Sequence, residues 1–128
     1  SLESLSSASR CSAVIWPNHS SSLFLASYFR SSPRPTFTPA GTFANVVMVD
    51  VLHHIEARDE YLKNLATYVA PAGRIAIVDF VPGRGGHVND PTQQVSKEQV
   101  AAWMIAAGFK PSEEIALFDD KWFVIYAR

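Results

Sequence analysis

The chain has 128 residues, of which 48% are hydrophobic, and a formal net charge of −1. This size allows one domain with a hydrophobic core. Nucleic acid is not expected as the main partner, because no Lys/Arg cluster offers the basic surface that phosphate binding needs. Cys11 is the only cysteine, which excludes an internal disulfide and paired-cysteine motifs and favours a reducing, cytoplasmic location. No apolar stretch approaches the roughly 20 residues of a membrane helix, so no membrane partner is expected.

Residues 1–36 differ in composition from the rest of the chain. They are rich in serine, carry helix-breaking prolines and show no sustained helix or strand period. Two short apolar runs, 13–16 and 23–26, are compatible with a strand and a helical turn, and disorder is an equal alternative. We therefore divide the chain into a Ser/Pro-rich leader of uncertain structure, 1–36, and an ordered part, 37–128.

The ordered part begins with a strand, a helix and a second strand. Residues 45–51 form a β-branched, nearly all apolar run, as expected for a parallel strand covered on both faces. An apolar stripe with helical spacing predicts a helix over about 58–70, which the Pro-Ala-Gly of 71–73 should end. Residues 74–80 then predict a second buried strand, completing a βαβ unit.

A long loop, 81–95, separates this unit from a second helix. Ser96 and Gln99 have the spacing of a capping box at the start of that helix. Strands are expected at about 113–118 and 122–127, and the short connection between them predicts an antiparallel hairpin. The stripe expected to be buried on the second helix consists of Val100, Trp103, Met104 and Ala107.

The order of these elements, together with four segments, resembles class I S-adenosylmethionine-dependent methyltransferases. The segments are Phe-Thr-Pro-Ala-Gly-Thr-Phe at 37–43, Val-Asp-Val-Leu-His-His-Ile-Glu at 49–56, Pro-Ala-Gly-Arg at 71–74 and Ile-Val-Asp-Phe at 77–80. The resemblance implies an α/β fold, a partial Rossmann-like methyltransferase sheet. That sheet would be mostly parallel with a C-terminal antiparallel hairpin and helices on its faces. Its strands would be the family's strands four to seven, with the seventh antiparallel beside the fifth.

Two parts of the family's cofactor site have no counterpart in this chain. These are the glycine-rich first loop and the acid that binds the ribose hydroxyls. The one glycine-rich stretch, Gly83-Arg84-Gly85-Gly86, follows the wrong strand. The resemblance therefore implies S-adenosylmethionine as cofactor with half of its site missing, which makes activity of this chain alone doubtful.

Polar residues follow both strands of the βαβ unit at the same sheet edge, where open α/β sheets bind ligands. The resemblance implies that Asp50 and Val51 lie beside the methionine part of the cofactor. His54, and less surely His53, would face the methyl acceptor. A histidine titrates near pH 6.5, so His54 is the candidate catalytic base for a hydroxyl, amine or thiol. Alternatively, one histidine caps or packs against the following helix and the other is solvated.

The loop after the second strand offers further candidates. Arg84 and His87 could bind substrate by closing over it, because three glycines suit a mobile lid, although a solvated loop is an alternative. Asp79 either points into the crevice or simply ends its strand. A metal is not expected at Asp50, His53, His54 or His87, because neighbouring histidines generally point apart and no HxH or HxxxH spacing occurs.

Two functions from different classes follow. The first is a methyltransferase that moves a methyl group to the oxygen, nitrogen or sulfur of a small molecule. The second is a non-catalytic, methyltransferase-derived fragment or interaction module, self-associating through the exposed edge of strand 45–51. A nucleotide-dependent oxidoreductase is a weaker third reading, because no GxGxxG turn is present.

Overall fold

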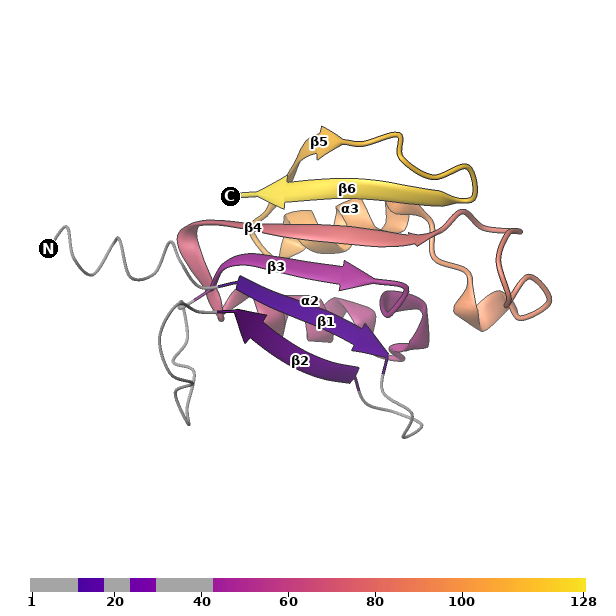
Figure 1. Ribbon diagram of the computed structural model, residues 1–128, viewed down its shortest axis with the longest axis horizontal. Helices are drawn as coiled ribbons and strands as arrows, with labels where there is room; N and C mark the ends of the chain where they lie inside the picture. The colour runs from indigo at the N-terminus through magenta and orange to yellow at the C-terminus, as the bar shows by residue number, and fades with distance from the viewer. Residues whose placement is uncertain (1–11, 18–23, 30–42) are drawn as a thin grey trace, which may run out of the picture.

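The computed structural model describes residues 12–17, 24–29 and 43–128. Its strands are β1 (Ser12–Pro17), β2 (Phe24–Phe29), β3 (Phe43–Val49), β4 (Val69–Phe80), β5 (Lys110–Glu114) and β6 (Lys121–Ala127). The helices are α2 (Arg58–Ala66) and α3 (Lys97–Ala106), with short 3-10 turns η1 (Leu52–His54) and η2 (Pro91–Gln93). The strands form one sheet in the order β2-β1-β3-β4-β6-β5, and both helices lie on one face of it (Figure 1).

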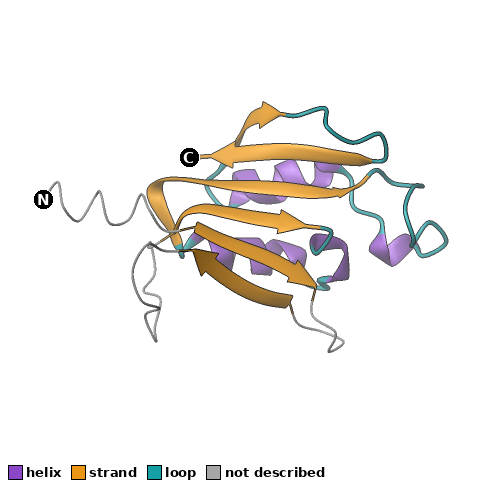
Figure 2. Cartoon of the chain, in the orientation of Figure 1, coloured by secondary structure: helices purple, strands orange, loops and turns teal. Residues whose placement is uncertain are grey.

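The sheet is mixed, so the expectation of a mostly parallel sheet is wrong. β3 pairs in parallel with β1 and β4, whereas β6 is antiparallel to both β4 and β5, and β1 is antiparallel to β2. The placement of the last strand, antiparallel beside β4, is as the methyltransferase resemblance implied. Helices were expected on the faces of the sheet, and in the described residues α2 and α3 share one face (Figure 2).

The N-terminal strands β1 and β2 extend the sheet beyond β3, which was predicted to be its edge. The first apolar run forms β1, but the second forms strand β2 rather than a helical turn. β1 pairs with β3 from Ser12 to Ile15, so the prediction that the 45–51 strand exposes its edge is wrong. The apolar run in β1 covers that edge by extending the backbone ladder. Residues 1–11, 18–23 and 30–42 lie outside the described residues, and the division of the chain at residue 36 stays a prediction.

The hydrophobic core lies between the sheet and the two helices. Along β6 the residues alternate between half-buried and buried, as a strand with one covered face requires. The main sheet residues of the core are Val46, Met48, Ile75, Ile77, Val124 and Tyr126, and the main helical ones are Leu62, Val100 and Met104. Within the described ranges no helix is long and apolar enough to cross a bilayer.

Helix α2 ends four residues earlier than predicted, because the chain turns into the sheet before the proline. The N–H groups of Thr67 and Tyr68 donate to carbonyls of the last helical turn. The Tyr68 carbonyl then accepts from the N–H of Phe43, which directs Val69 into the ladder beside β3. The Pro-Ala-Gly segment therefore lies inside β4, and Val69 contributes to the core from a strand rather than from a helix.

The C-terminal half is closer to expectation. Ser96 and Gln99 form the predicted capping box, in which the Ser96 hydroxyl accepts from the Gln99 N–H and Gln99 Oε1 accepts from the Ser96 N–H. In the predicted hairpin, however, β5 begins and ends earlier than expected. Residues 115–120 form the connection, and Leu117 and Phe118 are exposed rather than packed in a strand.

Replacing Gly73 by alanine tests the close backbone approach at the start of β4. A Cβ there would lie 2.5 Å from Val69 Cγ1 and 2.9 Å from the Ala70 carbonyl oxygen. Because the neighbouring backbone must shift, we expect the free energy of unfolding in urea to fall by about 1–3 kcal/mol. Gly86→Ala is the matched control, since its Cβ would meet nothing within 4 Å. Equal stability of the two variants would contradict the packing described.

Candidate functional site

The ends of β3 and β4 bring the predicted site residues to one edge of the sheet. Asp50 follows β3 with a φ of 55°, a left-handed conformation that a short polar residue such as Asp tolerates. Its N–H donates to the Val78 carbonyl of the neighbouring strand at 3.0 Å. The chain then turns through η1, so His53 and His54 lie beside the end of β4. The predicted proximity of the two strand ends is confirmed.

A buried hydrogen-bonded pair joins these two strand ends. His53 Nδ1 lies 2.7 Å from Asp79 Oδ1, and the His53 backbone N–H donates to Asp79 Oδ2 at 3.1 Å. The Phe80 N–H also donates to Asp79 Oδ1. With both oxygens accepting from backbone N–H groups, the carboxylate acts as an acceptor and Nδ1 is the donor. Asp79 therefore points inward and selects the tautomer of His53 whose Nε2 carries the lone pair.

Arg58 binds the backbone of η1, the turn that carries His53 and His54. The sequence analysis missed this role. Arg58 Nε donates to the Leu52 carbonyl and its Nη2 to the His53 carbonyl, both at 3.0 Å. Nη2 also donates to the Thr92 carbonyl in η2 at 2.6 Å. Burial lowers the pKa of this guanidinium, and the nearby Asp79 opposes that shift. An arginine in a helix's first turn, where positive charge is unfavourable, was the available signal.

The loop after β4 is anchored so that His87 faces the other two histidines. The His87 carbonyl accepts from the Asp90 N–H at 3.1 Å and from the Gln94 side-chain amide. The carboxylate of Asp90 in turn accepts from Thr92 at the start of η2. These bonds place the His87 ring centroid 5.1 Å from that of His53 and 5.3 Å from that of His54.

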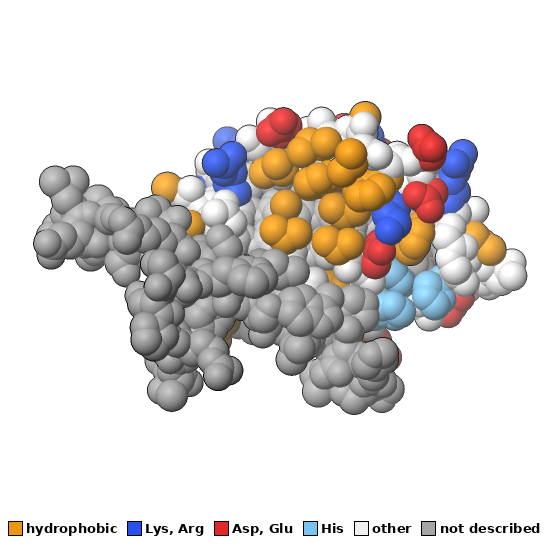
Figure 3. All heavy atoms as spheres, in the orientation of Figure 1, with side chains coloured by type: hydrophobic (Ala, Val, Ile, Leu, Met, Phe, Trp, Pro, Cys, Tyr) orange, Lys and Arg blue, Asp and Glu red, His pale blue; other side chains and the backbone are white. Residues whose placement is uncertain are grey.

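Three histidines thus form a cluster, which we call the histidine triad: His53, His54 and His87. The His53 and His54 rings are 4.1 Å apart, so the expectation that neighbouring histidines point apart is wrong here. One nitrogen from each residue lies within 4.8 Å of the others. His53 is buried, His87 half-buried and His54 exposed. Figure 3 shows histidine side chains gathered at one end of the molecule.

The surroundings of His54 favour its neutral form. Partial burial lowers its pKa from 6.5, and the positive charge that His53 and His87 can carry lowers it further. The carboxylates of Asp79 and Asp50 oppose this shift without cancelling it. At neutral pH the ring therefore offers a lone pair, which suits a proton acceptor or a metal ligand.

The described residues satisfy only one carboxylate oxygen of Asp50. Its Oδ2 bonds Lys121 Nζ at 2.7 Å, and that ammonium also lies 4.7 Å from the centre of the Phe80 ring. Oδ1 is buried and has no hydrogen-bond partner among the described residues. Lys121 was not singled out from the sequence, since a lysine at a strand start resembles any surface lysine. Val51, predicted beside the cofactor, places its side chain in the core.

Arg84 is not brought to the histidine triad in the structure. Its Nη1 donates to the Asp119 carbonyl at 3.1 Å, so the side chain is directed to the connection between β5 and β6. Its proposed contact with substrate stays a prediction, as does the closure of this loop.

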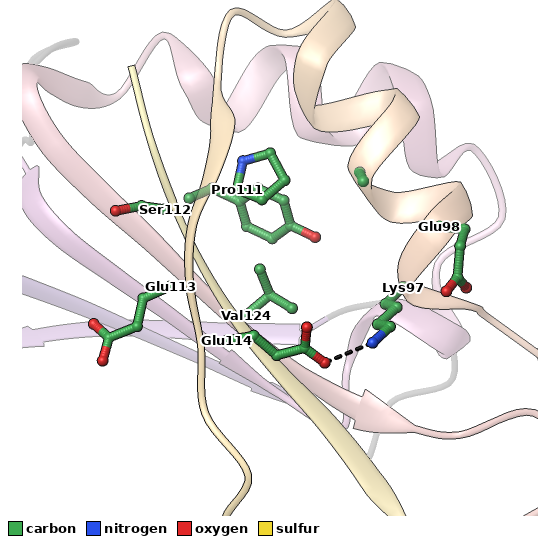
Figure 4. Close-up of a pocket in the computed structure, with 9 residues that line it drawn as sticks. Lys97, Glu98, Pro111, Ser112, Glu113, Glu114 and Val124 are labelled. Atoms are coloured by element: carbon green, nitrogen blue, oxygen red, sulfur yellow. Dashed lines mark hydrogen bonds and ion pairs between the residues drawn. The ribbon is translucent and has the colours of Figure 1, made fainter.

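A pocket of about 330 Å³ lies elsewhere, between α3 and β5 (Figure 4). Lys97 and Glu114 form an ion pair of 2.6 Å across it. None of the sequence-predicted site residues lines this pocket.

The electrostatics of His54 can be tested by NMR titration of the histidine ring protons. We expect a His54 pKa below 6.5, because burial and two histidine neighbours disfavour its charged form. The unfolded chain then binds the proton more readily, so acidification through about pH 6.5 should reduce stability. In His87→Ala the His54 pKa should rise towards its ordinary value. A pKa at or above 6.5 in the unmodified chain would contradict the arrangement.

Comparison with known proteins identifies the fold. The sequence matches no protein-family model and no curated protein. Several solved structures match, with sequence identities of 11–23%. A methyltransferase from Aquifex aeolicus has a TM-score of 0.61 at 17% identity over 78% of this chain and 53% of its own. One from Mesorhizobium loti has 0.56 at 13% identity over 70% and 64%.

A third match is 1,6-didemethyltoxoflavin-N1-methyltransferase from Burkholderia thailandensis, solved with bound 1,6-didemethyltoxoflavin and S-adenosylhomocysteine. It has a TM-score of 0.53 at 23% identity over 73% of this chain and 46% of its own. The chain therefore spans about half to two thirds of these proteins' length. The implied resemblance is confirmed at the level of fold: the described structure has the fold of part of a class I S-adenosylmethionine-dependent methyltransferase.

Proposed function

We propose that this chain supplies the C-terminal half of a methyltransferase domain that uses S-adenosylmethionine to methylate a small molecule. The likeness of fold supports the family, and the convergence of Asp50 and His54 at the strand ends supports the site. The observation that carries the proposal is that Asp50 Oδ1 is buried and has no hydrogen-bond partner in the described part of the chain. Such an oxygen is costly unless a donor reaches it, so it indicates a ligand with a positive or N–H group.

The methionine part of the cofactor fits this position. Its α-ammonium is a donor with positive charge, which complements the free oxygen of Asp50. Lys121 already holds the other oxygen and orients the carboxylate. Val51 would contribute only its backbone, because its side chain is in the core. When bound, the cofactor supplies an activated methyl group, so the protein's task is to position the acceptor and remove its proton.

His54 is suited to the acceptor's side of the site. Its lowered pKa keeps the ring neutral at pH 7, and its exposure lets an acceptor approach. It would take the proton of a hydroxyl, amine or thiol as the nucleophile attacks. His53 would act by position, since Asp79 holds its ring, while His87 forms the opposite wall.

The chain has no counterpart of the glycine-rich turn that would hold the adenosine part of the cofactor. The first glycine is Gly41, so no glycine-rich turn follows β1. Tight binding would therefore require further elements of the fold, in keeping with relatives that are longer than this chain. We infer weak, methionine-centred binding for the chain alone, of order 1 mM, which corresponds to about −4 kcal/mol.

Ligand titrations followed by amide NMR shifts test this proposal, because the method detects millimolar affinities. In buffer with a metal chelator, S-adenosylhomocysteine should shift the amides of residues 50–54, whereas adenosine should not. Asp50→Asn should weaken this binding about tenfold or more by removing the charged acceptor. Asp119→Asn, an exposed acid in the β5–β6 connection, is the control and should bind as the unmodified chain does. Equal binding of adenosine, or no shifts at millimolar S-adenosylhomocysteine, would contradict the proposal.

A second candidate function, self-association, is favoured by the sheet face that no described helix covers. The face opposite the helices presents hydrophobic side chains over its centre (Figure 3). By the strand alternation, Val49, Phe123 and Ile125 lie on it, and Val49 is 36% exposed. Parallel strands are normally covered on both faces, so a second copy of the chain is a fitting cover.

Light scattering after size exclusion distinguishes this candidate. We expect the mass of a dimer at about 100 μM chain and of a monomer for Val49→Lys, because the added charge must be desolvated in the interface. Val88→Lys is the matched control, since Val88 is 44% exposed in the loop after β4. It should remain a dimer. A monomeric unmodified chain would rule out this second function and leave the first intact.

A further inference from the structure

The histidine triad combines three features that a metal site needs, and methyl transfer does not require them together. The three nitrogens lie within 4.8 Å of one another. They come from two segments, η1 and the loop after β4, each anchored by its own hydrogen bonds. The three rings also lie against one another, with centroids 4.1–5.3 Å apart. A bound cation would use one lone pair from each ring.

The contact between His53 and Asp79 supplies the support that metal-binding histidines usually have. A ligating histidine commonly donates its second ring N–H to a carboxylate, which orients the ring and raises its basicity. Asp79 Oδ1 accepts from His53 Nδ1 at 2.7 Å, and both residues are buried, with exposed fractions of 1% and 4%. Nε2 of His53 is therefore the nitrogen left for an ion, and its ring is already oriented.

The distances between the three histidine nitrogens are somewhat longer than those in a metal-bound site. In a tetrahedral zinc site with Zn–N bonds of 2.0–2.1 Å, the ligand nitrogens are about 3.4 Å apart. The triad nitrogens must therefore approach by at most roughly 1.4 Å. Exposed His54 and half-buried His87 can make this approach by side-chain rotation, while His53 stays in place.

We propose that the histidine triad binds one divalent transition-metal ion of the zinc class through His53, His54 and His87, with Asp79 positioning His53. Three neutral imidazoles suit Zn²⁺, Co²⁺, Ni²⁺ or Cu²⁺ rather than Mg²⁺ or Ca²⁺, which prefer oxygen. Three protein ligands leave a coordination position open for water or a ligand. The metal occupies the lone pair of His54 that the proposed base would use, so the loaded site and that base are alternative states. The inference does not depend on methyl transfer.

Calorimetry with Zn²⁺ alone, on untagged chain freed of metal by a chelator, tests the site. We expect one ion per chain. His54→Gln and His87→Gln should each weaken binding at least about tenfold. Asp79→Asn, in a positioning residue, should weaken it by about 10–100-fold. His19→Gln is the matched control, because His19 is the remaining histidine and lies outside the described residues. It should change the affinity less than about twofold.

Visible absorption of the Co²⁺-loaded chain gives a readout that a folding defect would not imitate. The strong bands of a four-coordinate ion should appear in the unmodified chain and in His19→Gln. They should vanish in His87→Gln, whose far-ultraviolet circular dichroism should stay unchanged. The absence of zinc binding, or His54→Gln and His87→Gln binding zinc as tightly as the unmodified chain, would overturn the proposal.

Discussion

The hydrogen-bonded pair of His53 and Asp79 is the interaction on which the functional end of this molecule depends. It joins a residue just after β3 to a residue near the end of β4, and both side chains are almost completely buried. A hydrogen bond to a charged group typically contributes about 1.5–3 kcal/mol, and losing this one would leave a buried polar group without one of its partners. The pair therefore ties the turn that follows β3 to the end of β4, and with it the position of the neighbouring His54.

Other contacts extend this constraint to the loop after β4. Arg58 ties the carbonyl of His53 to that of Thr92, and the bonds on the His87 carbonyl hold the loop below it. On the opposite side, Lys121 orients Asp50 from the last strand. The site is thus assembled from two strand ends, a helix start and a loop. This places charged and titratable groups at the carboxyl edge of a parallel strand pair, where α/β sheets bind ligands.

Much of this could be predicted from local sequence patterns. The β-branched run before Asp50, the capping box at Ser96 and the meeting of two strand ends all follow from short-range rules. The errors arose where tertiary pairing prevailed: β1 covered the edge of β3, and Val69 joined a strand because Phe43 was available to pair with it. The sequence analysis named His53, His54 and His87 but expected no metal, because neighbouring histidines generally point apart. The His53 and His54 rings lie 4.1 Å apart, and the loop brings His87 to them from 33 positions further along the chain.

The pairing of Asp79 with His53 Nδ1 can be measured directly by long-range ¹H–¹⁵N NMR of the histidine rings at neutral pH. This account predicts that His53 is the Nδ1–H tautomer and that its ring proton exchanges slowly with water, because the proton is buried against a carboxylate. An Nε2–H tautomer, or rapid averaging between the two tautomers, would contradict the central claim that this contact organises the site.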